Sequence, residues 1–168
     1  MSLSDIVFLG TALITIMAAV GMVSFKNIVH SALSLVFSFL GVAAIYFQLE
    51  AGFLGLVQIL VYAGAISVLI IFAIMLVMDR EVNETNLSHP KKKYCGGIIA
   101  LLITLGLGAA IINTVWTPAK GYLPEDKVGA IAELLMGNYV VAFEIAALLL
   151  LVAVVGAIIL AKGVGQND

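Results

Sequence analysis

Long stretches without a charged residue constrain this sequence more than any other feature. Four uncharged stretches, of 20, 23, 28 and 26 residues, cover 6–25, 27–49, 51–78 and 94–119. A fifth, from Leu134 to Ala161, carries a single charge, Glu144. A helix needs roughly 20 apolar residues to cross a hydrocarbon core about 30 Å thick. Each stretch is therefore long enough to span a membrane.

The composition excludes several other classes of protein. Charged residues make up 11% of the 168 residues and apolar residues 63%, against about 25% and about 45–50% in soluble domains. Such a chain is neither a cytosolic enzyme nor a disordered protein. Its single cysteine excludes an internal disulfide framework. A net charge of −2 argues against a nucleic-acid partner.

We predict an all-α integral membrane protein with five transmembrane helices, forming a single domain over residues 1–168. Helices are expected because in lipid the backbone must satisfy its own hydrogen bonds. The first span follows Asp5 rather than a basic segment, so we expect it to be retained rather than cleaved as a signal peptide. The expected spans are 5–25, 28–49, 52–78, 95–117 and 138–161.

Basic residues are unequally divided between the two sides of such a protein. Lys120 and Lys127 fall on the side of the N-terminus. Cytoplasmic loops carry an excess of Lys and Arg, so we predict an outside N-terminus and a cytoplasmic C-terminus. The six basic residues on the cytoplasmic side are Lys26, Arg80, Lys91, Lys92, Lys93 and Lys162.

The segments between spans are short and are expected to be connecting loops, the longest being 79–93 and 117–133. The sequence contains no glycine-rich phosphate loop and no cluster of Cys and His at metal-ligand spacing. No combination of Ser, His and Asp is placed to meet in an aqueous pocket. We therefore expect no catalytic residue and no metal site in this chain.

Glu144 is the one charge inside a predicted span. Intramembrane carboxylates are costly and usually face protein or water. Two interpretations are equally supported by the residues alone. Glu144 is either part of a proton relay or polar network, or an acid near the membrane interface that is satisfied by a neighbouring chain.

The third span places Gly52, Gly55, Gln58 and Tyr62 on one side of a helix, at spacings of three, three and four. Small residues allow close helix packing, so a packing stripe is the favoured interpretation. The alternative is an irregular stretch that lines a polar path. The 28 uncharged residues exceed the length of a straight span, and either tilt or a π-bulge accounts for the excess.

Asn27 and His30 lie at the cytoplasmic start of the second span. A hydrogen-bonding role at the helix start is favoured for His30 over a role as a ligand.

Three stretches resemble one known family. The run VQILVYAGAISVL (57–69) resembles the third helix of subunit J of proton-pumping NADH-quinone oxidoreductase, respiratory complex I. Its mitochondrial counterpart is NADH dehydrogenase subunit 6. Residues 27–33 are similar to the start of that family's second helix, although Ile28 stands where Pro is common. Residues 143–152 look like its fifth helix.

The resemblance implies a non-catalytic membrane-arm subunit that couples quinone reduction to proton translocation. Tyr62 and Gly64 would belong to a π-bulge that converts to regular helix and gates a water-filled path. Glu144 would contribute to a polar contact. Gln58 is neutral where some relatives have an acid, so a charged proton carrier is not expected there.

The resemblance also implies cofactors and partners. The complex would use FMN, iron–sulfur clusters and quinone on or between other subunits, and this chain would bind none of them itself. Its partners would be other membrane-arm subunits and the lipid bilayer, in the plasma or inner membrane. An autonomous small transporter or channel, and a purely structural assembly subunit, are the alternative functions.

Overall fold

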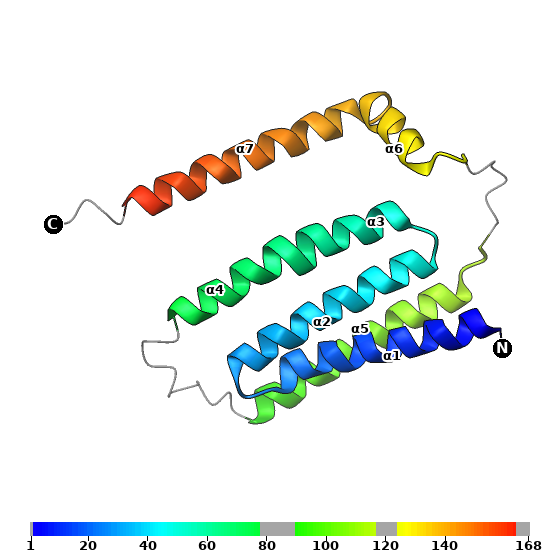
Figure 1. Cartoon of the computed structure of the whole chain (residues 1–168). Helices are drawn as coiled ribbons and strands as arrows, with labels where there is room; N and C mark the ends of the chain where they lie inside the picture. Colours follow the sequence, from blue (N-terminus) through cyan, green and yellow to red (C-terminus); the bar gives the residue numbers. More distant parts are fainter. Residues whose placement is uncertain (1, 78–89, 117–123, 164–168) are drawn as a thin grey trace. The chain divides into compact units, whose positions relative to one another are not determined.

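The computed structural model of the chain describes residues 2–77, 90–116 and 124–163. Five of its helical stretches are long and apolar enough to cross a membrane, which confirms the five predicted spans. The orientation of the termini stays a prediction. The elements in order (Figure 1) are α1 (Leu3–Ser24), α2 (Ile28–Gln48), α3 (Gly52–Val57), η1 (Gln58–Ile66), α4 (Ser67–Val77), α5 (Pro90–Asn113), α6 (Lys127–Met136) and α7 (Val140–Gly163).

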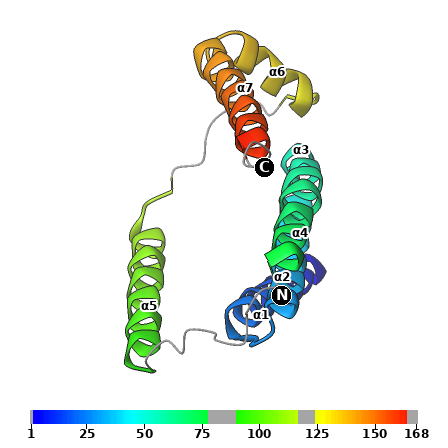
Figure 2. The same ribbon diagram turned by 90° about the vertical axis from the view of Figure 1, so that its left-hand side faces the viewer.

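The chain divides into two compact units, Met1–Thr114 and Val115–Asp168. The expectation of a single domain stays a prediction. In the first unit α2 has the central place, because it contacts α1 as well as α3, η1 and α4. Figure 2 shows this group of helices from a second side. In the second unit α6 contacts α7.

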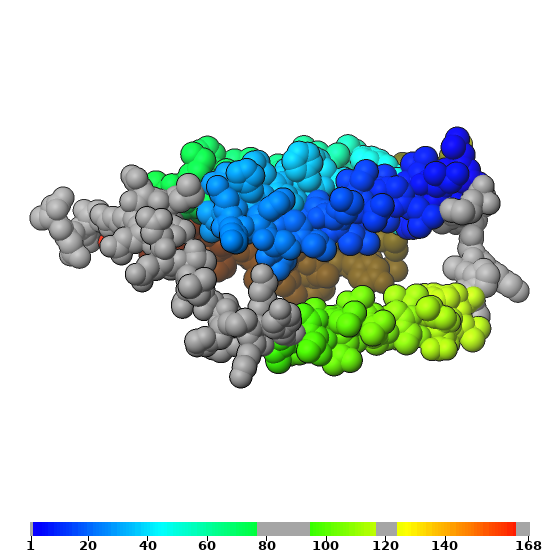
Figure 3. All heavy atoms as spheres, turned by 90° about the horizontal axis from the view of Figure 1, so that it is seen from below, coloured from blue at the N-terminus to red at the C-terminus, as the bar shows by residue number. Residues whose placement is uncertain are grey.

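Small residues bring α1 and α2 close together, and both helices run along the same face of the first unit (Figure 3). A Cβ atom at Gly41 would overlap the side chain of Thr15. A Cβ atom at Gly21 would lie 2.7 Å from Ser34 Oγ. Ser34 Oγ in turn donates a hydrogen bond to the carbonyl of Ala18 at 2.7 Å. Close packing and cross-helix hydrogen bonds are the interactions available between helices in lipid.

The short helix α6 corrects the sequence prediction, which placed residues 117–133 in a loop. The described part of that segment enters a helix at Lys127. Asp126 begins it as an N-cap, since its Oδ1 accepts a hydrogen bond from the Gly129 N–H at 2.9 Å. Apolar residues recur at helical spacing through Val128, Ile131 and Leu134. The cap and this spacing were visible in the sequence.

Candidate functional site

The middle of the third span is a π-helix. α3 runs without a break into η1, which has nine residues, and α4 continues the same span. In a π-helix each N–H bonds to the carbonyl five residues earlier. At the end of η1 the Ser67 N–H donates to the carbonyls of both Tyr62 and Gly64. Of the two explanations for this span's length, the structure shows a π segment.

Gly64 fits the widened turn because it has no side chain. A Cβ atom there would lie 3.2 Å from the Ile59 carbonyl oxygen, five residues earlier in the same segment. That separation is tighter than an ordinary van der Waals contact. A branched side chain at Gly64 would therefore press on a carbonyl group within the π segment.

One face of α2 packs against one side of the π segment. The rings of Phe39 and Tyr62 meet edge to face, with centroids 5.5 Å apart and an interplanar angle of 68°. Nearer the α2–α3 turn, the Phe47 ring would lie 2.9 Å from a Cβ atom at Gly55. Ala43, which is 1% exposed, lies between the two phenylalanines on α2. The third span therefore packs closely on α2 both before and within η1.

The predicted stripe on the third span is only partly buried. Gly55 is buried and Gln58 is 8% exposed, whereas Gly52 is half-buried and Tyr62 is 44% exposed. Neither the Gln58 carboxamide nor the Tyr62 hydroxyl forms a hydrogen bond with another residue in the described part of the chain. The site therefore combines a widened backbone turn with two polar groups inside an apolar span.

A comparison with known protein families decides where this chain belongs. The family described as NADH-ubiquinone/plastoquinone oxidoreductase chain 6 matches residues 18–160. The chain belongs to this family.

Individual relatives agree with the family match. NAD(P)H-quinone oxidoreductase chain 6 of Synechocystis is 42% identical over 163 residues, covering 92% of this chain and 79% of the relative. The F(420)H(2) dehydrogenase subunit J of Methanosarcina mazei is 35% identical over 169 residues, covering 99% and 95%. The organellar chromatophore subunit 6 of Paulinella chromatophora is 36% identical over 159 residues, covering 94% and 77%.

The resemblance noted in the sequence is thereby confirmed. The chain is therefore a multi-pass membrane subunit of an oxidoreductase complex of the NADH-quinone oxidoreductase type. The names of the relatives give different electron donors, NAD(P)H for some and F420H2 for another. The family alone therefore leaves the donor open.

Glu144 lies in the second unit, in the second turn of α7, and its side chain is exposed. The Glu144 carboxylate forms no hydrogen bond or ion pair with another described residue of the chain. Among the described residues, no group of three His, Cys, Asp or Glu is arranged to hold a metal ion. Both interpretations of Glu144 stay predictions.

Asn27 and His30 lie together at the start of α2. Asn27 is the N-cap, and its Oδ1 accepts a hydrogen bond from the Val29 N–H at 2.9 Å. The His30 ring is exposed and meets the Phe25 ring edge-on, with centroids 6.3 Å apart. The helix start is therefore capped by a hydrogen bond that Asn27 Oδ1 accepts, and His30 contributes a ring contact.

Ser67 is the site residue that sequence reasoning missed. It is 2% exposed, and its Oγ donates a hydrogen bond to the Tyr62 carbonyl at 2.8 Å. The sequence signal was present, because Ser67 is the one Ser or Thr between residues 52 and 77.

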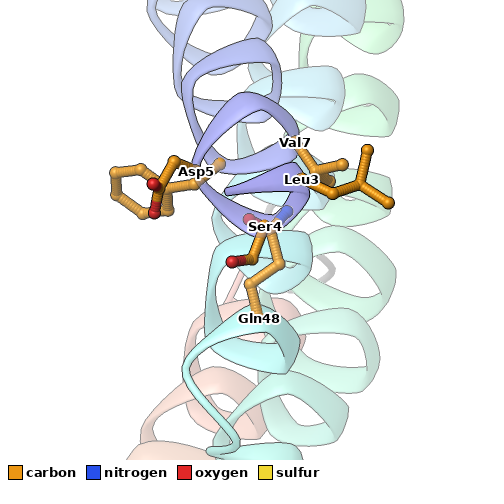
Figure 4. Close-up of a pocket in the computed structure, with 6 residues that line it drawn as sticks. Leu3, Ser4, Asp5, Val7 and Gln48 are labelled. Carbon is orange, nitrogen blue, oxygen red and sulfur yellow. The ribbon is translucent and has the colours of Figure 1, made fainter. Parts of the chain in front are cut away.

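A shallow groove lies between the start of α1 and the end of α2 (Figure 4), with a volume of about 500 Å³. Its polar groups are engaged in local structure: Asp5 Oδ2 accepts from the Ser2 N–H at 2.8 Å, and Gln48 Nε2 donates to Thr11 Oγ1 at 2.9 Å. The lining residues are Leu3, Ser4, Asp5, Val7, Phe8 and Gln48. We assign no function to this groove.

Proposed function

We propose that this subunit couples quinone reduction to proton translocation through a change of register in its third span. In one state residues 58–66 form the π segment, and in the other they form a regular α-helix. The observation that carries the proposal is the nine-residue π-helix in the middle of a membrane span. π segments are rare and occur frequently at functional sites.

The conversion would produce a defined movement. A π-bulge contains one residue more than the α-helical turn it replaces. Its removal turns the following helix by about 100° relative to the preceding one. In the present register α4 has one face that is less exposed than the rest, made of Ser67, Ile70, Ile71 and Ile74. This turn would carry that face away from α2, which α4 contacts.

Two polar side chains of the π segment suit a gate for protons. The Gln58 carboxamide and the Tyr62 hydroxyl both donate and accept hydrogen bonds. A turn of the span would move the two groups relative to each other and to neighbouring subunits. Protons would then cross only in the register that aligns these groups with a hydrated path.

The cofactors are proposed to lie on or between other subunits. Iron–sulfur clusters are held by several cysteine thiolates, and this chain has a single cysteine. FMN and quinone are placed elsewhere by the same proposal, so this chain contributes to energy conversion without touching the redox groups. Its partners are other membrane-arm subunits, in the plasma or inner membrane.

The test is Gly64→Val in the intact complex. A branched side chain against the Ile59 carbonyl would destabilise the π register by about 1–3 kcal/mol, which is a factor of about 5 to 150 in the equilibrium between registers. We expect protons pumped per quinone reduced to fall severalfold. Pumping and quinone reduction are measured in membrane vesicles, and assembly is measured by native electrophoresis.

Gly106→Val in α5 is the matched control, because nothing lies within 4 Å of a Cβ atom at Gly106. It should assemble and pump at the wild-type level. An assembled Gly64→Val complex that pumps normally would favour the alternative of a purely structural subunit. A chain that migrates as a small free oligomer in native membranes would favour the autonomous transporter.

A role for Glu144 is proposed separately. If this carboxylate takes part in coupling, Glu144→Gln should depress quinone-linked proton pumping while the complex still assembles. Glutamine retains the size and a hydrogen-bonding end but removes the titratable proton. Normal turnover and normal pumping in the assembled variant would leave Glu144 with a structural role.

A further inference from the structure

We propose that Ser67 is the positioning residue that holds the π segment in register, through its hydroxyl. The consequence for proton pumping rests on the proposed function, whereas the effect on the helix itself does not. Ser67 marks the point where the π-helix ends and α4 begins.

The side-chain hydrogen bond of Ser67 reaches back five residues, as the backbone hydrogen bonds of a π-helix do. Ser and Thr side chains within α-helices ordinarily bond to the carbonyl four residues earlier. Thr104 does so in α5, where its Oγ1 donates to the Ala100 carbonyl at 2.9 Å. Ser67 Oγ instead donates to a carbonyl five residues earlier, that of Tyr62 at 2.8 Å. Its acceptor is therefore selected by the widened turn.

The Tyr62 carbonyl needs this second donor more than a carbonyl in a regular helix would. The Ser67 N–H is shared between the carbonyls of Tyr62 and Gly64, so Tyr62 receives only part of that bond. The hydroxyl completes the hydrogen bonding of a carbonyl inside an apolar span. In a regular α-helix each interior carbonyl already receives a full N–H bond, so the same hydroxyl adds less there.

The small size of Ser67 also favours the π register. Ser67 is 2% exposed and is the most deeply buried residue of the inward face of α4. A turn of about 100°, which is the angle of one residue, would bring Ile66 or Val68 to this position. Both side chains are larger and branched, so the close contact favours the register that places serine there.

Ser67→Ala tests the hydroxyl, because alanine keeps the small size. Loss of one hydrogen bond, worth about 0.5–1.5 kcal/mol, corresponds to a factor of about 2 to 12. In the intact complex we expect amide hydrogen exchange across residues 58–67 to be about twofold to twelvefold faster. Exchange in α1 and α2 should not change. Hydrogen exchange at the wild-type rate across 58–67 would overturn the proposal.

The control is Thr104→Val, which removes a hydroxyl bonded in the ordinary α-helical register. It should leave exchange across 58–67 unchanged, and an equal acceleration in both variants would overturn a specific role for Ser67. Pumping is measured on the same samples. Faster exchange with normal pumping supports the role of Ser67 and contradicts the coupling proposal. Normal exchange in Ser67→Ala together with a pumping defect in Gly64→Val would contradict the role of Ser67 and support the coupling proposal.

Discussion

The pair α1–α2 and the third span use the same kinds of residue for different purposes. Gly21 and Gly41 remove side chains between two helices. Gly64 removes one between two turns of its own helix. Likewise Ser34 donates across to the neighbouring helix, whereas Ser67 donates back along its own span. Glycine and serine therefore fasten two helices together in one region and support an irregular backbone in the other.

This difference predicts which region tolerates change. The α1–α2 pair has closely packed contacts in regular helices, so its disruption should separate helices and reduce assembly. Under the proposed function, the third span has an α-helical alternative to its π hydrogen-bond pattern, with hydrogen bonding of similar extent. Its disruption should change register first and leave the complex assembled.

The largest effect is expected from Gly41→Val. The new side chain would overlap Thr15 on α1, and overpacking of this kind costs about 1–3 kcal/mol. We expect less of the chain in the assembled complex, measured by native electrophoresis and by its temperature of release. Gly10→Val is the control, because nothing lies within 4 Å of a Cβ atom there. Equal assembly of the two variants would contradict a close α1–α2 contact.

A smaller effect is expected where the two regions meet, at Phe39 and Tyr62. Edge-to-face aromatic pairs contribute about 0.5–1.5 kcal/mol beyond their buried area. A double-mutant cycle with Phe39→Leu and Tyr62→Leu should give a coupling energy in this range. It is measured from hydrogen exchange across residues 58–67. Additive single variants would show that α2 does not support the π segment through this pair.

The smallest effect is expected from Ser34→Ala. Hydrogen bonds between membrane helices average about 0.6 kcal/mol. Loss of the bond from Ser34 to Ala18 should slightly lower the temperature at which the chain is released from the complex. Exchange across 58–67 and proton pumping should not change. A pumping defect in this variant would show that the two regions are not separable.

The sequence predicted the site in part. Gly64 entered through resemblance to a family, and Gln58 and Tyr62 through helical spacing. Ser67 was overlooked because a single serine in an apolar span carries no periodic signal, and its importance depends on which carbonyl it reaches. The helix α6 was overlooked although Asp126 is an N-cap residue and the following apolar residues have helical spacing.

Charge and hydrophobicity, read along the chain, were sufficient for the five spans and the membrane class, because lipid leaves a backbone no hydrogen-bond partner except itself. They did not decide between α and π turns in the third span. Both patterns satisfy nearly all the same backbone groups, so the choice depends on a few contacts. Those contacts are the carbonyl of Ile59 beside Gly64, the ring of Phe39 on Tyr62, and the buried hydroxyl of Ser67. The first and third of these contacts form within the folded span itself, and the ring contact exists only once the third span is folded against α2.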